Sequence, residues 1–262
     1  MSTPDGGLAA TLYGPCRAQA TLPNGVRVTV ACHTNYPFDE SIRIEVTPER
    51  DAAFPLYFRV PGWCDNAAIE VNGRPTEVLI NSNGFVKISR TWKASDEIAL
   101  CLPMRRRLVY GRETSYPAIE YFRQPHSRKL AHVEGIHSPF VSVMYGPLLL
   151  ALPIPDETPN HVASQTGWNY GLDVDSLDLT DPVEVIRSPM PNPWRWQLSA
   201  PLRLRVDAIK FDWQPTELNP LPDAPVAGSA KTRIELIPYG CTKFRISMFP
   251  VTDRLWLKLA EK

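Results

Sequence analysis

The stretch Pro55-Leu-Tyr-Phe-Arg-Val-Pro-Gly-Trp63 opens the part of the chain that decides the fold, and Asp96-Glu-Ile-Ala-Leu-Cys-Leu-Pro-Met104 closes it. Between them lie Ala68-Ile-Glu-Val-Asn-Gly-Arg-Pro75 and Asn83-Gly-Phe-Val-Lys-Ile-Ser-Arg-Thr-Trp92. Each piece is a short run of alternating apolar and polar residues bounded by Gly, Pro or Asn. This pattern predicts short antiparallel strands joined by tight turns, as in a β-sandwich.

The same alternation continues on both sides of this stretch. Apolar residues at i, i+2 and i+4 turn one face of a strand inward. Such runs occupy residues 26–30, 42–46, 202–206, 232–240 and 242–250. Residues 140–152 are apolar on both faces, which predicts one central strand of a second unit. The pairs Asn72-Gly73 and Asn83-Gly84 predict hairpin turns, because both residue types readily adopt positive φ angles.

Composition agrees with a loop-rich β protein. The 262 residues include 27 prolines and 14 glycines, and proline is excluded from helix interiors and central strands. A hydrophobic content of 44% with seven tryptophans argues against disorder. We therefore predict an all-β chain of two packed antiparallel β-sandwich, jelly-roll-like units. Residues 110–137, which hold three of the five histidines, are predicted to cross irregularly between them.

Charge and cysteine content bound the partners and the compartment. Lys plus Arg and Asp plus Glu both total 28, so nothing favours nucleic acid or an anionic membrane surface as a partner. The single basic cluster, residues 105–107, is typical of a solvated rim. No segment has the length and hydrophobicity of a membrane span, and no signal peptide is recognisable. Five scattered cysteines without a C-x-x-C pair favour reduced, mostly buried thiols, so we expect a cytoplasmic protein.

Motifs for metal or cofactor chemistry are weak. Neither Gly-x-Ser-x-Gly nor Gly-x-x-x-x-Gly-Lys occurs. Three histidines, His126, His132 and His137, lack the spacing and the second ligand pair of a zinc site. The acidic segment 173–181 lacks the central Gly and terminal Glu of a calcium loop. We expect no cofactor and no metal.

Two further residue classes are relevant to sugar chemistry. Glycosidases use a pair of carboxylates, and the candidates are Glu113, Glu120 and Glu134, whose sequence spacing does not reveal their separation in space. Aromatic rings stack on sugar C–H faces, and Trp194 and Trp196 are the candidate carbohydrate-binding residues. Other tryptophans, Trp63 and Trp92, are expected to seal the ends of the sandwich. No residue is assigned a catalytic role.

The order of several segments carries a family resemblance. Together with the opening stretch they are Leu12-Tyr-Gly-Pro15, Thr34-Asn-Tyr-Pro37, Tyr145-Gly-Pro-Leu-Leu149, Ile237-Pro-Tyr-Gly240 and Phe244-Arg-Ile-Ser-Met-Phe-Pro250. From Leu12 to about Pro250 the chain resembles the C-terminal β region of glycoside hydrolase family 127 (GH127), the β-L-arabinofuranosidases. The resemblance implies a first sandwich over residues 1–112, completed by residues 232–262. The second sandwich, residues 113–231, would be an insertion.

The resemblance also implies what this chain lacks. Family members carry an (α/α)₆ barrel with a zinc site of one glutamate and several cysteines, one of which is the nucleophile. None of the five cysteines here matches a ligand position, so all are expected to be structural: Cys16, Cys32, Cys64, Cys101 and Cys241. The implied partners are a helical-barrel catalytic domain or polypeptide and a plant-type carbohydrate.

Three functions remain open at this point. The first is a non-catalytic accessory region that braces a catalytic barrel absent from this chain. The second is a stand-alone carbohydrate-binding module that uses Trp194 and Trp196. The third is an independent hydrolase, which requires two of the three candidate glutamates to face each other across a cleft.

Overall fold

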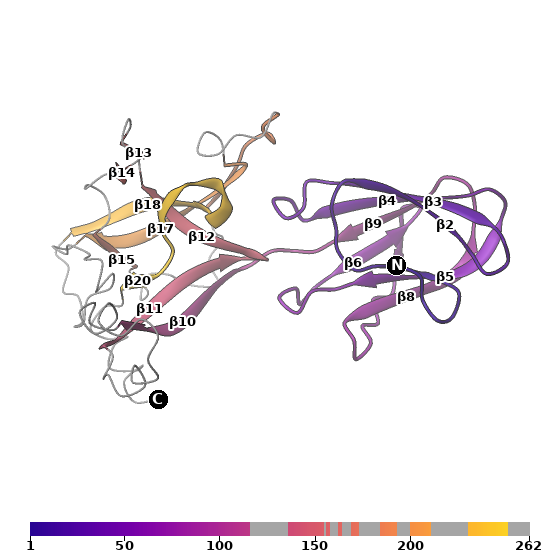
Figure 1. Cartoon of the computed structure of the whole chain (residues 1–262), viewed down its shortest axis with the longest axis horizontal. Helices are drawn as coiled ribbons and strands as arrows, with labels where there is room; N and C mark the ends of the chain where they lie inside the picture. The colour runs from indigo at the N-terminus through magenta and orange to yellow at the C-terminus, as the bar shows by residue number, and fades with distance from the viewer. Residues whose placement is uncertain are drawn as a thin grey trace, which may run out of the picture. The chain divides into compact units, whose positions relative to one another are not determined.

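The computed structural model describes residues 1–115, 136–154, 156–157, 162–163, 169–172, 184–192, 200–210 and 230–250. In these residues the chain consists of β-strands and connecting turns, with a single 3₁₀ turn, η2 (Tyr239–Cys241) (Figure 1). The chain divides into two compact units, Met1–Arg105 and Arg106–Lys262. The predicted all-β, sandwich-like fold is confirmed.

The first unit contains two sheets. The smaller sheet has three strands, in the order β1 (Leu8–Ala10), β5 (Ala52–Arg59) and β8 (Phe85–Trp92). The larger sheet has six, in the order β2 (Cys16–Thr21), β3 (Arg27–Thr34), β4 (Ser41–Pro48), β9 (Asp96–Cys101), β6 (Ala68–Val71) and β7 (Arg74–Thr76). All of these pairings are antiparallel except that of β1 with β5, which is parallel.

The core of the first unit follows from the alternation in the sequence. In β4 the buried residues are every second one, Ile42, Ile44 and Val46, and the residues between them face solvent more. Strands of both sheets contribute to one hydrophobic cluster, in which Phe58 and Trp92 are the largest fully buried side chains. Burial of a large apolar side chain stabilises a fold by about 1.5–3 kcal/mol. The core therefore holds the two sheets face to face.

A buried aspartate joins two turns of the first unit. Asn72 adopts φ 53°, as the predicted Asn-Gly hairpin requires. Its side-chain amide donates to Asp96 Oδ1 at 2.8 Å, and its Oδ1 accepts from the Glu97 amide at 2.9 Å. Asp96 Oδ2 accepts from the Lys93 amide at 2.9 Å. The β6–β7 turn is thus tied to the β8–β9 turn through one carboxylate.

The second unit is built around one large sheet. Its main path runs β10 (Arg106–Ser115), β11 (Ile136–Tyr145), β12 (Leu148–Ile154), β18 (Ala230–Pro238), β17 (Leu202–Lys210) and β15 (Tyr170–Leu172). Strands β16 (Val185–Arg187), β19 (Phe244–Ile246) and β20 (Phe249–Pro250) pair with β17, β12 and β11 respectively. A separate pair is formed by β13 (Asp156–Glu157) and β14 (Val162–Ala163). The core of the second unit includes Val141, Leu150, Leu204, Leu236 and Phe249, all with 0% exposure.

Two sequence predictions for the second unit are wrong in detail. Residues 140–152 do not form one strand, because a turn at Gly146 and Pro147 divides them into β11 and β12. Gly146 has φ 53°, which interrupts an extended strand. Residues 110–137 do not cross irregularly throughout, since β10 and β11 pair in register as far as Ser115 and Ile136. Residues 116–135 lie outside the described part of the chain.

The pairing of the C-terminal strands differs from the predicted domain plan. Strand β18 pairs with β12 and β17, and strands β19 and β20 pair with β12 and β11, all within the second unit. The described strands after residue 229 thus pair with strands of the second unit, whereas the resemblance implies that residues 232–262 complete the first sandwich. The first compact unit ends at Arg105, and the predicted first sandwich ends at residue 112. Residues 251–262 lie outside the described residues.

Candidate functional site

A large open cavity lies inside the first unit, between its two sheets. Its volume is about 660 Å³, and strands β1 and β5 of the small sheet and β2, β3 and β4 of the large sheet contribute to its walls. Protein interiors rarely contain voids larger than a water molecule. A space of this size is instead within the range of ligand-binding pockets, about 300–1,000 Å³. It is the main candidate site among the described residues.

The cavity exists because β2 carries short side chains at the place where the small sheet ends. Cys16, Ala18 and Ala20 alternate along β2 and line the cavity. They pair with Cys32, Val30 and Val28 of β3, which line it as well. The small sheet has three strands against six and ends at the three-residue strand β1. The inner face at β2 is therefore uncovered, and Cys16 and Ala18 remain exposed.

The N-terminal segment forms one rim of the cavity. Met1 exchanges two backbone hydrogen bonds with Ala9 of β1: its amino group donates at 2.9 Å and its carbonyl accepts at 2.7 Å. Leu12 lies on the rim with 82% of its surface exposed, and Met1 with 81%. A Cβ added to Gly7 would lie 2.3 Å from the Pro55 carbonyl oxygen, so only glycine permits this close approach to β5.

Asp5 fixes this segment to the small sheet. Its carboxylate accepts hydrogen bonds from Thr3 Oγ1 at 2.6 Å, from the Tyr57 hydroxyl and from Lys87 Nζ at 3.0 Å. These hydrogen bonds hold the pKa of Asp5 well below its ordinary value, and the hydrogen bond from Thr3 contributes most. The hydrogen bond from Lys87 in turn raises the pKa of the lysine. Both groups are therefore charged near neutral pH, and neither is among the described residues that line the cavity.

None of the described residues that line the cavity has a charged side chain. Its polar side chains are hydroxyls, one amide and the Cys16 and Cys32 thiols. The Tyr13 hydroxyl already donates to the Arg59 carbonyl at 2.7 Å, and burial raises the pKa of Tyr13. Most glycosidases use two carboxyl groups that flank the bond, and no described residue of these walls supplies one. The cavity is thus suited to binding uncharged, largely apolar groups.

The cysteines are not arranged for nucleophilic or metal chemistry. All five are free, and Cys32, Cys64 and Cys241 are buried. Burial raises the pKa of Cys32, Cys64 and Cys101, and it raises that of Cys241 to about 11. Since the thiolate is the reactive form, the raised pKa values make these four thiols less reactive near neutral pH. Within the described residues, no group of three or more His, Cys, Asp or Glu side chains is placed to hold a metal ion.

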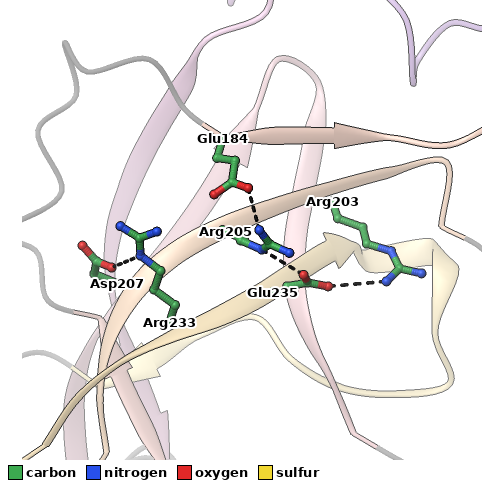
Figure 2. Close-up of polar contacts among 6 residues, drawn as sticks. All are labelled: Glu184, Arg203, Arg205, Asp207, Arg233 and Glu235. Carbon is green, nitrogen blue, oxygen red and sulfur yellow. Dashed lines mark hydrogen bonds and ion pairs between the residues drawn. The ribbon is translucent and has the colours of Figure 1, made fainter.

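A row of ion pairs crosses strands β16 to β18 of the second unit (Figure 2). Arg205 contacts Glu184 at 2.6 Å and Glu235 at 3.0 Å, and Arg203 also contacts Glu235, at 3.4 Å. Beside them, Arg233 contacts Asp207 at 3.2 Å. The three guanidinium groups balance the three carboxylates, and two of the pairs join residues directly opposite in the β17–β18 register. This arrangement stabilises the sheet and leaves no excess charge for a ligand.

The structure places only some of the residues predicted from sequence. Trp92 is fully buried and donates from Nε1 to the Phe54 carbonyl at 2.9 Å, and Trp63 packs against the same core. Trp92 is therefore a core residue, and Trp63 is packed against that core. Glu113 lies in β10 opposite Ser138 of β11. The following candidates lie outside the described residues: Trp194, Trp196, Glu120, Glu134, His126, His132 and the acidic segment 173–181.

Sequence reasoning did not find the cavity. Its signal was the alternation of small residues in Cys16-Arg-Ala-Gln-Ala-Thr21, where most other strands of the first unit place Ile, Val, Leu or Phe. Among the residues that the structure describes, no helix has the length and hydrophobicity needed to cross a membrane.

Most of the first unit is similar to a domain of a known protein family. Residues 7–104 match the family description "Beta-L-arabinofuranosidase, GH127 middle domain". The matched residues lie within the first unit and correspond to a GH127 region other than the catalytic barrel. No curated protein matches the sequence.

Solved structures extend the likeness across the second unit. A glycoside hydrolase is 23% identical, with a TM-score of 0.61 over 93% of this chain. The GH127 β-L-arabinofuranosidase Ara127N-Se from Geobacillus stearothermophilus T6 is 22% identical, with a TM-score of 0.57 over 95%. Another GH127 β-arabinofuranosidase is 18% identical, with a TM-score of 0.59 over 93%. At these identities the likeness concerns the fold. The chain spans about a third of the length of each, at 36%, 34% and 34%.

Proposed function

We propose that this chain is a non-catalytic accessory region of a β-L-arabinofuranosidase-like glycoside hydrolase, and that it braces a helical catalytic barrel. The observation that carries the proposal is the match of residues 7–104 to the GH127 middle domain. The GH127 resemblance implies a catalytic barrel, and the solved relatives are about three times as long as this chain. Catalysis would belong to the barrel, and stability and positioning to the β units.

The described site supports binding better than hydrolysis. The described residues that line the cavity between the two sheets include no carboxylate, and four of the five thiols have raised pKa values. A thiolate nucleophile of the kind that the resemblance implies requires the opposite shift, toward a lower pKa. The cavity walls can bury apolar groups of a partner, and that role suits an accessory region.

The test combines this chain with a barrel from a relative. The Geobacillus enzyme would be produced without the region that this chain resembles, and its thermal unfolding would be measured with and without the full chain. We expect a higher unfolding temperature and a co-eluting complex, because a partner that binds only the folded barrel stabilises it by mass action. Hydrolysis of 4-nitrophenyl β-L-arabinofuranoside should require the barrel. Turnover by this chain alone, or the absence of any complex, would contradict the proposal.

A further inference from the structure

Resting on the accessory role above, we propose that the cavity of the first unit receives an extended, uncharged and apolar segment of the barrel-bearing polypeptide. The segment pairs with the free edge of β2 and turns alternate side chains into the cavity. This is recognition by strand addition, in which the backbone supplies affinity and the pocket supplies selectivity for side chains.

The walls of the cavity determine the chemistry of the occupant. None of the described lining residues has a charged side chain, so a charged segment would lose its hydration without gaining an oppositely charged side chain. A sugar is a poor fit too, because its hydroxyls need several converging donors and acceptors, and the Tyr13 hydroxyl is already bonded to Arg59. Aliphatic and aromatic side chains match the walls formed by Val28, Val30 and Phe58.

The backbone beside the cavity is open on one side. Among the described residues, strand β2 is the edge of the six-stranded sheet, and its six residues pair only with β3. Natural edge strands are usually protected by charges, proline or bulges. Strand β2 contains no proline, and Arg17 is its single charged residue. On the opposite wall, Met1 and Ser2 pair with the outer edge of β1.

The relatives indicate where the occupant comes from. The matched segment is a middle domain, and about two thirds of each solved relative lies outside the region that this chain covers. Leu12 and Met1, among the most exposed large hydrophobic side chains of the described residues, both stand on the rim of the cavity. Exposed apolar side chains gathered around an open apolar cavity are typical of a protein interaction site.

The first arm of the test identifies the chemistry of the site. A phage-displayed library of random decapeptides would be selected on the full chain. We expect enriched peptides with alternating apolar residues and no charge on the apolar face. Bound peptide should slow maleimide labelling of Cys16 at least tenfold, because this thiol lines the cavity and is exposed. Labelling of Cys101, which is partly exposed and does not line this cavity, is the control within the molecule.

Substitutions separate the cavity from the rest of the sheet. Ala18→Arg places a charge at the mouth of the cavity at a position that is already exposed, so the fold is retained, and peptide affinity should fall at least tenfold. Thr47→Arg, on the outer face of the same sheet, is the matched control and should bind as the parent does. Leu12→Ser is a second variant, at an 82% exposed rim position, and should weaken binding several-fold.

The second arm uses the truncated Geobacillus barrel in place of the peptide. Protection of Cys16 by the barrel, lost in Ala18→Arg, would support the proposal. A barrel complex that leaves Cys16 fully reactive would overturn the docking site and leave the accessory role intact. Peptide binding without barrel binding would instead overturn the accessory role and, with it, the proposed occupant. Cys16 protection that rises with the concentration of the chain alone would identify a second copy as the occupant and also refute the proposal.

Discussion

Replacing Asp96 by asparagine removes the charge of the buried carboxylate that joins two turns of the first unit. Asp96 is 7% exposed and accepts hydrogen bonds from Asn72 Nδ2 and the Lys93 amide, with the Arg90 guanidinium 3.7 Å away. Hydrogen bonds to a charged acceptor contribute about 1.5–3 kcal/mol each, and the asparagine amide can accept only one of the two. We expect Asp96→Asn to lower the free energy of unfolding by about 2–3 kcal/mol, roughly 30- to 150-fold in the folded-to-unfolded ratio.

The effect should depend on pH in a defined direction. Burial alone would raise the pKa of Asp96, but the hydrogen bonds from Asn72 and Lys93 and the nearby Arg90 charge outweigh it and lower the pKa. A lowered pKa stabilises the fold at pH values above the unfolded value of about 3.9, and this stabilisation disappears as pH falls through the folded value. The difference between parent and Asp96→Asn should therefore be full at pH 5–7 and shrink toward pH 2.

Urea unfolding followed by tryptophan fluorescence at several pH values measures this difference. Glu97→Gln is the matched control, because Glu97 is the adjacent carboxylate, is 45% exposed and contacts Arg43 at 3.1 Å. Exposed ion pairs contribute about 0–1 kcal/mol, so this variant should unfold almost as the parent does. A loss below about 0.5 kcal/mol for Asp96→Asn, or a loss that does not change between pH 7 and pH 2, would refute the reasoning.

Three further predictions concern other parts of the chain. Trp92→Phe leaves the Phe54 carbonyl without its donor in the core and should cost about 1–3 kcal/mol in a thermal or urea unfolding experiment, beyond the loss of ring volume. Glu235→Gln removes the carboxylate shared by two arginines, and the side chains of these ion pairs are about 40% exposed. The free energy of unfolding should therefore change by less than about 1 kcal/mol, and that of the variant should depend little on salt concentration. The double variant Trp194→Ala, Trp196→Ala should form the barrel complex as the parent does. Affinity electrophoresis in arabinan tests the alternative. Binding of arabinan by the parent and not by the variant would favour the carbohydrate-binding function over the accessory role.

The elements predicted from sequence were those decided by local chemistry. The alternation in residues 42–46 and the Asn72-Gly73 pair each specify a strand or a turn within a few residues, and the structure has both. Gly146 is a local turn signal too, but it lies inside a continuous apolar run, and that run favours one uninterrupted strand. The buried position of Trp92 could be predicted because it ends an alternating strand.

Strand pairing over long distances was not predictable in the same way. Strand β18 is compatible in pattern with either unit, and its partners β12 and β17 are selected by interactions far apart in sequence, such as the ion pair of Glu235 with Arg205. The candidate site depended on a comparison between sheets. Alanine at positions 18 and 20 has meaning only once the small sheet is seen to end at β1, which leaves those residues without a facing strand.

The shape of the first unit connects its sequence to its proposed role. A closed sandwich needs similar numbers of strands in its two sheets, or larger side chains where one sheet extends past the other, because a void forfeits the contacts of the atoms around it. Here the six-stranded sheet extends past a three-stranded one, and the uncovered strand carries alanine and cysteine where leucine or phenylalanine would fill the space. Small side chains at an uncovered edge leave room for side chains from another segment. This shape is what supports the proposed docking site: the first unit would supply the larger part of a core, and a segment of the barrel-bearing polypeptide would complete it.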